Sequence, residues 1–189
     1  MPRMNRGLAP RVHVAAVVAP LAAFLSIAPP HAQTKRLPQP AVRYVPSPQS
    51  VVDAMLAMAH VTSSDVVYDL GSGDGRIPIT AAQRYGAQGV GIEIEPRLIA
   101  EAKDNAVKAG VANRVVFLNE DLFETDIRPA TVVTLFLLPR LNQQLIPKLK
   151  RELRPGARIV SHQFDMGEQW PPEKSQDVNG LMIYLWTIK

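Results

Sequence analysis

A glycine-rich loop between an apolar run and a helix constrains this chain more than any other feature. Residues 66–80 read Val-Val-Tyr-Asp-Leu-Gly-Ser-Gly-Asp-Gly-Arg-Ile-Pro-Ile-Thr. The apolar run is typical of a buried strand, and Gly71, Gly73 and Gly75 allow the backbone to turn sharply and to approach a ligand closely. The helix that begins near Arg76 directs free N–H groups toward such a ligand. The pattern predicts a ligand-binding loop between a strand and a helix.

The spacing of the three glycines distinguishes between two classes of ligand. A dinucleotide-binding loop has the pattern G-x-G-x-x-G, but here Arg76 stands at the last position and the third glycine comes one residue earlier. The pattern from Asp69 to Gly75, which includes Ser72, is instead typical of class I methyltransferases that bind S-adenosylmethionine. The methionine carboxylate of that cofactor suits the helix N-terminus, and its ammonium suits Asp69. A dehydrogenase is disfavoured, and a tight strand-to-helix turn without a ligand is the remaining alternative.

Two more carboxylates follow the next two apolar runs. Glu93 comes directly after Gly-Val-Gly-Ile at 89–92, and Asp121 and Leu122 follow Val-Val-Phe-Leu at 115–118. In right-handed strand–helix–strand units the carboxyl ends of neighbouring parallel strands meet at one edge of the sheet. We therefore expect Glu93 to accept hydrogen bonds from both ribose hydroxyls of S-adenosylmethionine, and Asp121 and Leu122 to meet the adenine. An N-cap or a solvated loop charge is the plainer alternative for each acidic residue.

Alternating apolar and amphipathic segments predict the fold class. After a first helix from Ser47 to His60, the strands are expected at 66–70, 89–93, 115–118, 131–137, 157–164 and 181–188, and further helices at 76–85, 96–110 and 139–153. Such alternation is typical of an α/β, Rossmann-like, doubly wound sheet that is mostly parallel and has helices on both faces. We expect about six strands, with the last one antiparallel because only about 16 residues precede it.

The charge of the chain is divided unevenly between its N-terminus and the rest. Six of the 21 basic residues precede Tyr44, whereas all 17 acidic residues follow it, so residues 44–189 carry a net charge of −2. A nucleic-acid enzyme normally presents a positive surface, so we expect no nucleic-acid partner. The chain has no cysteine, which excludes disulfides and thiolate metal sites, and we predict no metal site.

The first 33 residues differ in composition from the rest. Three arginines at positions 3, 6 and 11 precede an uncharged run at 12–28, and small residues and prolines follow it. The segment resembles a signal peptide or a short membrane anchor, and a transit peptide is a further alternative. We therefore expect a protein that is associated with the bacterial inner membrane or exported through it, with the side left open because the flanking charges balance. Residues 34–46 read as a proline-rich linker and 47–189 as the methyltransferase domain.

Several segments in order resemble one family. They are Tyr-Val-Pro-Ser-Pro at 44–48, Asp-Leu-Gly-Ser-Gly-Asp-Gly-Arg-Ile at 69–77, Phe-Leu-Leu-Pro at 136–139 and Gly-Ala-Arg-Ile-Val-Ser at 156–161, followed by Phe164 and Trp170. Together they are similar to the small protein-lysine methyltransferases related to the mitochondrial enzymes that modify the adenine nucleotide translocase and the ATP synthase c subunit. The resemblance implies methyl transfer to a lysine ε-amine of a protein, in or near a membrane, with cofactor contacts at Asp69, Gly71, Gly73, Glu93 and Asp121.

The chemistry requires a pocket for the acceptor lysine. Positioning supplies most of the catalysis of an in-line displacement, and an apolar pocket lowers the pKa of an amine. Tyr44, Phe136 and Pro139 are the candidate lining residues, and ordinary packing at a strand end is the alternative for Phe136. His162 could accept a proton or hydrogen-bond a neighbouring loop. Two other functions stay open: a small-molecule methyltransferase of the same fold, and a non-catalytic module that retains the cofactor fold.

Overall fold

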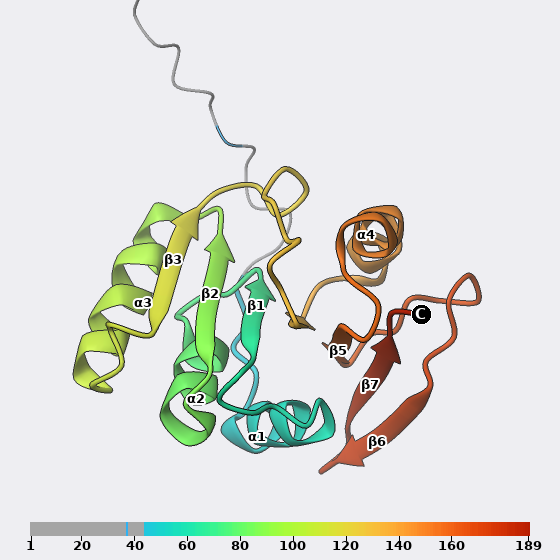
Figure 1. The fold of residues 1–189 in the computed structure, drawn as a ribbon, viewed down its shortest axis with the longest axis horizontal. Coiled ribbons are helices and arrows are strands. Elements are labelled where there is room, and N and C mark those ends of the chain that lie inside the picture. Colours follow the sequence, from blue (N-terminus) through green and yellow to red (C-terminus); the bar gives the residue numbers. More distant parts are fainter. Residues whose placement is uncertain (1–36, 38–43) are drawn as a thin grey trace, which may run out of the picture. The chain divides into compact units, whose positions relative to one another are not determined.

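The computed structural model of the chain describes residue 37 and residues 44–189 (Figure 1). Its centre is one seven-stranded sheet in the order β3-β2-β1-β4-β5-β7-β6. The strands are β1 (Val66–Leu70), β2 (Gln88–Glu93), β3 (Val115–Asn119), β4 (Val132–Leu135), β5 (Arg158–His162), β6 (Lys174–Val178) and β7 (Leu181–Thr187).

The sheet confirms the predicted fold class. Strands β1 to β5 pair in parallel, whereas β7 pairs antiparallel with both β5 and β6. The strand order reverses at β1, whose two neighbours are β2 and β4. The carboxyl ends of strands at such a reversal are the usual ligand site of an open α/β sheet.

Helices cover both faces because successive residues of each strand point to opposite sides. On one face, Val67, Val132 and Val160 pack with the apolar residues of α1 (Gln49–Met58) and α2 (Arg76–Tyr85). On the same face, α3 (Pro96–Lys108) packs with α2 and with Phe117 of β3. On the other face, Leu70 and Leu135 pack against α4 (Pro139–Glu152).

Strand β6 is the element that the sequence prediction omits. Its residues Lys174 to Val178 are polar except the last and are almost all exposed, so they show no apolar signal. The turn after it is marked, because Asn179 and Gly180 have φ values of 57° and 83°. An Asn-Gly pair with two positive φ angles is the preferred two-residue hairpin turn. Residues 44–189 therefore form seven strands where we expected about six, and the last two of these strands form a hairpin.

The predicted membrane location is wrong for the part of the chain that the structure describes. No helix within residues 44–189 combines the length and the apolar character that crossing a bilayer requires. The apolar run at 12–28, from which that location was inferred, lies outside the described residues, as does the linker apart from Leu37 and residues 44–46.

Candidate methyltransferase site

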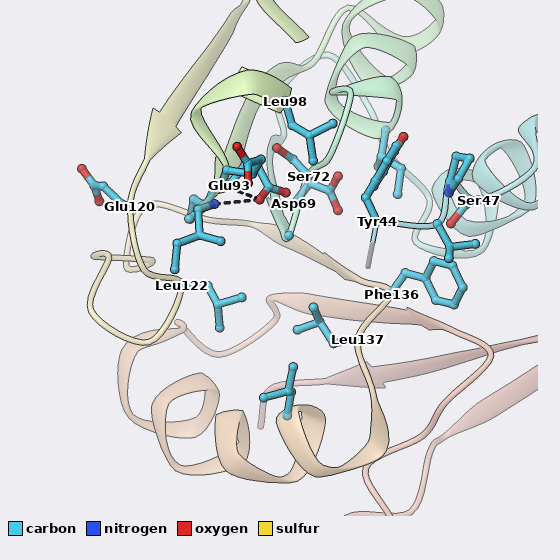
Figure 2. A pocket seen from close by; sticks show the side chains of 18 of the residues that line it. Tyr44, Ser47, Asp69, Ser72, Glu93, Leu98, Glu120, Leu122, Phe136 and Leu137 are labelled. Atoms are coloured by element: carbon cyan, nitrogen blue, oxygen red, sulfur yellow. Dashed lines mark hydrogen bonds between the residues drawn. The ribbon is translucent and has the colours of Figure 1, made fainter. Parts of the chain in front are cut away.

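A cavity of about 680 Å³ opens at the carboxyl ends of β1, β2 and β4 (Figure 2). Asp69 and Gly71 reach it from the end of β1, Glu93 from the end of β2, and Phe136 and Leu137 from the end of β4. The strand reversal at β1 creates this position, because the loops after β1 and β4 diverge from one another.

The amides of the glycine loop are engaged within the protein. Gly71 N and Ser72 N both donate to Ile92 O at 2.9 Å, and Gly73 N donates to Glu93 Oε2 at 2.9 Å. Arg76 N, at the start of α2, donates to the side chain of Asp74 at 3.2 Å. A phosphate-binding loop needs its amides free for the ligand, so this arrangement argues against a dinucleotide.

The three glycines have different structural roles. Gly71 lines the cavity, whereas Gly73 and Gly75 do not. A Cβ on Gly73 would lie 2.0 Å from the ring of Tyr44, and a Cβ on Gly75 would lie 2.6 Å from the ring of Phe117. Both residues also have positive φ angles. Two of the three glycines are thus required by packing within the protein and not by approach to a ligand.

The carboxylate of Glu93 is held by three backbone amides. Gly73 N donates to Oε2, while Ile94 N and Glu95 N donate to Oε1 at 2.8 and 2.9 Å. A carboxylate has about four acceptor sites, so a ligand hydroxyl finds its free acceptor position mainly on Oε2. The expected contact of Glu93 with both ribose hydroxyls stays a prediction.

Asp69 is a buried carboxylate at the cavity wall. It is 3% exposed, and its Oδ1 accepts a hydrogen bond of 2.7 Å from Thr134 Oγ1. Burial, assisted by the negative charges of Glu93 and Asp74, outweighs that hydrogen bond and raises the pKa of Asp69 to about 7. A buried carboxylate of this kind is stabilised when a cation binds beside it.

One buried hydroxyl at the cavity, Ser72 Oγ, has no hydrogen-bond partner among the described residues. The hydroxyl of Tyr44 is also buried, and it lies beside Asp74. Burial, together with the charge of Asp74, raises the pKa of Tyr44 to about 12, so its phenol is neutral. A buried polar atom without a partner is costly, and a polar ligand in the cavity would satisfy Ser72 Oγ.

The end of the cavity beside β2 and β3 is a slot with apolar walls and a charged rim. Ile94, Leu98 and Leu122 line it together with Asp121 and Glu120. Asp121 Oδ1 accepts from Phe123 N at 2.9 Å, which fixes the turn after β3. The apolar side chains provide surfaces for a flat ring, and the sequence prediction included only Asp121 and Leu122 of this group.

The opposite end lies between Tyr44, Ser47, Phe136 and Leu137 (Figure 2). Phe136 also lies against His162, with ring centroids 3.9 Å apart. Pro139 is exposed and does not line the cavity, because it is the first residue of α4. Its neighbour Leu138 is 46% exposed and does not line the cavity either, whereas Leu137 does.

Most of the charged side chains that line the cavity are acidic. They are Asp69, Glu93, Glu95, Glu120 and Asp121, against Arg76 and Arg97. Both arginines have carboxylate partners, since Arg76 pairs with Asp74 at 2.6 Å and Arg97 pairs with Glu101 at 3.4 Å. The cavity therefore suits a cationic ligand better than an anionic one.

Comparisons with known proteins agree with this geometry. The family model of the ANTKMT methyltransferase domain matches residues 69–174. The chain is 47% identical to a protein-lysine N-methyltransferase of Saccharolobus islandicus, over 79% of this chain and 95% of that protein. It is 36% identical to the adenine nucleotide translocase lysine N-methyltransferase of Mus musculus, over 69% of this chain, and spans 56% of the mouse protein.

A solved structure gives the same fold with a cofactor product bound. It is described as an RNA methyltransferase from Salinibacter ruber in complex with S-adenosylhomocysteine, and it has a TM-score of 0.75 and 57% identity, covering 76% of this chain and 94% of that one. The chain belongs to the ANTKMT family of S-adenosylmethionine-dependent protein-lysine methyltransferases. The predicted family, enzyme class and cofactor are confirmed.

Proposed function

We propose that this protein transfers a methyl group from S-adenosylmethionine to the ε-amine of a lysine in a protein. The observation that carries the proposal is the character of the cavity, which is acidic on its charged walls and apolar at the end formed by Phe136 and Leu137. Acidic walls attract a cationic side chain, and an apolar end favours the neutral amine that attacks the methyl carbon. The amine nitrogen forms a bond to the methyl carbon as the bond from that carbon to the sulfonium sulfur breaks, and S-adenosylhomocysteine leaves as a neutral thioether.

In this proposal the two buried carboxylates, Asp69 and Glu93, bind different parts of the cofactor. Asp69 pairs with the methionine ammonium, and Glu93 accepts a ribose hydroxyl on Oε2, whose hydrogen bond from Gly73 N fixes its direction. Asp121 accepts from the adenine amine, and Leu122 packs on the ring. Ser72 Oγ, buried and without a partner within the described part of the chain, provides a further hydrogen bond to the methionine end.

The acceptor lysine enters beside Tyr44 and Phe136. Because the pKa of Tyr44 is raised to about 12, its hydroxyl, which is buried beside Asp74, stays neutral and does not act as a base. The lysine proton leaves to solvent before the amine enters the apolar end. Pro139 contributes only indirectly, by starting α4 close to Leu137, which lines the cavity.

RNA is the second candidate substrate because the structural relative from Salinibacter ruber is described as an RNA methyltransferase. Residues 44–189 carry a net charge of −2, and both arginines at the cavity are paired with carboxylates. An RNA enzyme gains most of its affinity from free basic groups on phosphates. The charge distribution therefore favours protein over RNA.

We further propose that the acceptor lysine lies on an apolar surface, such as that of a membrane protein. Val45, which lines the cavity, is 59% exposed, and Leu138, which follows the lining residue Leu137, is 46% exposed. Exposed apolar side chains beside a binding cleft are typical of a surface that packs against an apolar partner.

Labelled S-adenosylmethionine tests these assignments. The purified full chain is incubated separately with membrane proteins, other proteins, RNA and small solutes from the same cells, and the products are identified by mass spectrometry. We expect methyl-lysine in a protein of the membrane fraction. Label in RNA or in small solutes, without methyl-lysine, would overturn the proposal.

A further inference from the structure

The segment just before α1 forms one wall of the cavity. We call residues 44–47 the strap. All four residues line the cavity, and Ser47 is buried although the strap has no regular secondary structure. A wall of this kind depends on side-chain contacts for its position, because no backbone ladder holds it in place.

Three contacts fix the strap to the rest of the site. The ring of Tyr44 covers Gly73. Arg76 Nη1 donates to Ser47 O at 2.9 Å, and Ser47 Oγ shares a hydrogen bond of 2.8 Å with His162 Nδ1. Only the last of these hydrogen bonds is fully buried, and it joins residues 115 positions apart.

His162 is placed to hold the strap and the acceptor end together. It is the last residue of β5 and is 2% exposed. One edge of its ring bonds to Ser47, and the ring lies against Phe136, which also lines the cavity. Burial lowers the pKa of His162, so the imidazole that makes these contacts is neutral.

We propose that His162 is a positioning residue, which keeps the strap closed over the bound cofactor through Ser47. The inference rests on the proposed cofactor site and is independent of the identity of the acceptor. His162 does not itself line the cavity, so it acts through Ser47 and Phe136. Without the Ser47–His162 bond, the strap opens more often and S-adenosylhomocysteine dissociates faster.

Four variants of the full chain separate this role from general stability. Ser47→Ala and His162→Phe both remove the hydrogen bond, and the second keeps a ring against Phe136. His162→Asn keeps a hydrogen-bonding group near the position of Nδ1. Ser161→Ala is the matched control: it removes a buried hydroxyl one residue away, which donates to Phe164 O at 2.5 Å on the face of β5 toward α4.

The probe is S-adenosylhomocysteine, with affinity measured by calorimetry and dissociation by stopped flow. One hydrogen bond contributes about 0.5 to 1.5 kcal/mol net, so we expect affinity to fall about two- to tenfold in Ser47→Ala and His162→Phe. The double variant should lose no more than either single one. His162→Asn should restore most of the affinity, and Ser161→Ala should change the unfolding midpoint but not the affinity.

Additive losses in the double variant would overturn the proposal, as would unchanged affinity and dissociation in a folded Ser47→Ala. An equal loss of affinity in Ser161→Ala would mean that the weaker binding comes from a general loss of stability, and this result would also overturn the proposal. A wrong assignment of lysine as the acceptor would give a different result. The four variants would then show the expected affinities for S-adenosylhomocysteine, but the labelled products would contain no methyl-lysine.

Discussion

The buried carboxylate of Asp69 should destabilise the folded domain at neutral pH when no cofactor is bound. Its negative charge serves to bind the cationic cofactor, and no positive group of the described residues compensates it. Replacing Asp69 by asparagine keeps the size of the side chain and an acceptor for Thr134 Oγ1, which donates to Asp69 at 2.7 Å. We expect Asp69→Asn to be more stable than the wild type at pH 8 without cofactor, and to bind S-adenosylhomocysteine at least tenfold more weakly.

The magnitude follows from the pKa. Burial, the largest cause, and the charges of Glu93 and Asp74 raise the pKa of Asp69 from 3.8 to about 7. Each pKa unit corresponds to about 1.4 kcal/mol, so ionising this group costs the folded state about 4 kcal/mol above pH 7. The folded state binds the proton of Asp69 more tightly than the unfolded state does. The stabilisation of the folded state by this proton is therefore complete below about pH 4, and it is lost as the pH rises to 7. Between pH 5 and pH 8 the advantage of the variant should widen by about 2.5 kcal/mol.

Urea unfolding of both proteins at pH 5 and pH 8 measures this difference. Asp65→Asn is the matched control, at a residue that directly precedes β1. Burial alone would raise the pKa of Asp65, but hydrogen bonds from Thr131 and Thr62 and the charge of Arg158 lower it. Asp65→Asn should therefore destabilise the domain. A gap between Asp69→Asn and the wild type that does not change from pH 5 to pH 8 would refute the reasoning.

Three further changes test other parts of the site. Glu93→Gln removes the charge that accepts from three amides, so calorimetry should show weaker S-adenosylhomocysteine binding and urea unfolding a loss of about 1 to 3 kcal/mol. Gly73→Ala places a Cβ 2.0 Å from the Tyr44 ring at a φ of 52°, which should cost about 1 to 2 kcal/mol for the backbone alone, with a smaller total loss in a Tyr44→Ala background. Leu138→Ser removes an exposed apolar side chain next to Leu137 of the cavity wall, so methylation of the protein acceptor, measured as methyl-lysine formation, should slow while the calorimetric affinity for S-adenosylhomocysteine stays unchanged; an equal loss of both would contradict a contact of Leu138 with the acceptor protein.

The parallel part of the fold was predictable because its signals are local. The apolar runs of β1 to β5 alternate with amphipathic helices, and the handedness of the connections then brings the ends of β1 and β2 together. Asp69 and Glu93 could therefore be placed at one cavity from the sequence alone. The sequence prediction missed some residues of the cavity wall, such as Ile94 and Leu98. They follow Glu93 closely in the sequence, and apolar residues just after a strand end were the signal that could have identified them.

The polar hairpin strand and the electrostatics of the site were not predictable in the same way. Strand β6 is an exposed edge without an apolar face, and charged or polar residues are common at such edges because they discourage pairing between molecules. The pKa of Asp69 depends on its burial and on carboxylates five and 24 positions away in the sequence. No spacing rule gives that combination, since it arises only when the strands have paired.

The position of the strap explains two features of the glycine loop, at Gly73 and Arg76, which the sequence pattern alone attributes to the ligand. Gly73 lacks a side chain because Tyr44 occupies the space of its Cβ. Arg76 stands where a dinucleotide loop has glycine, and its guanidinium reaches Ser47 O while it pairs with Asp74. The motif read from the sequence is thus shaped as much by a segment about 30 residues earlier as by its ligand. Because the glycine loop has no side chain at position 73, the ring of Tyr44 can pack directly on its backbone. The strap therefore lies close to the loop, and its residues Tyr44 and Ser47 form part of the wall of the acceptor end.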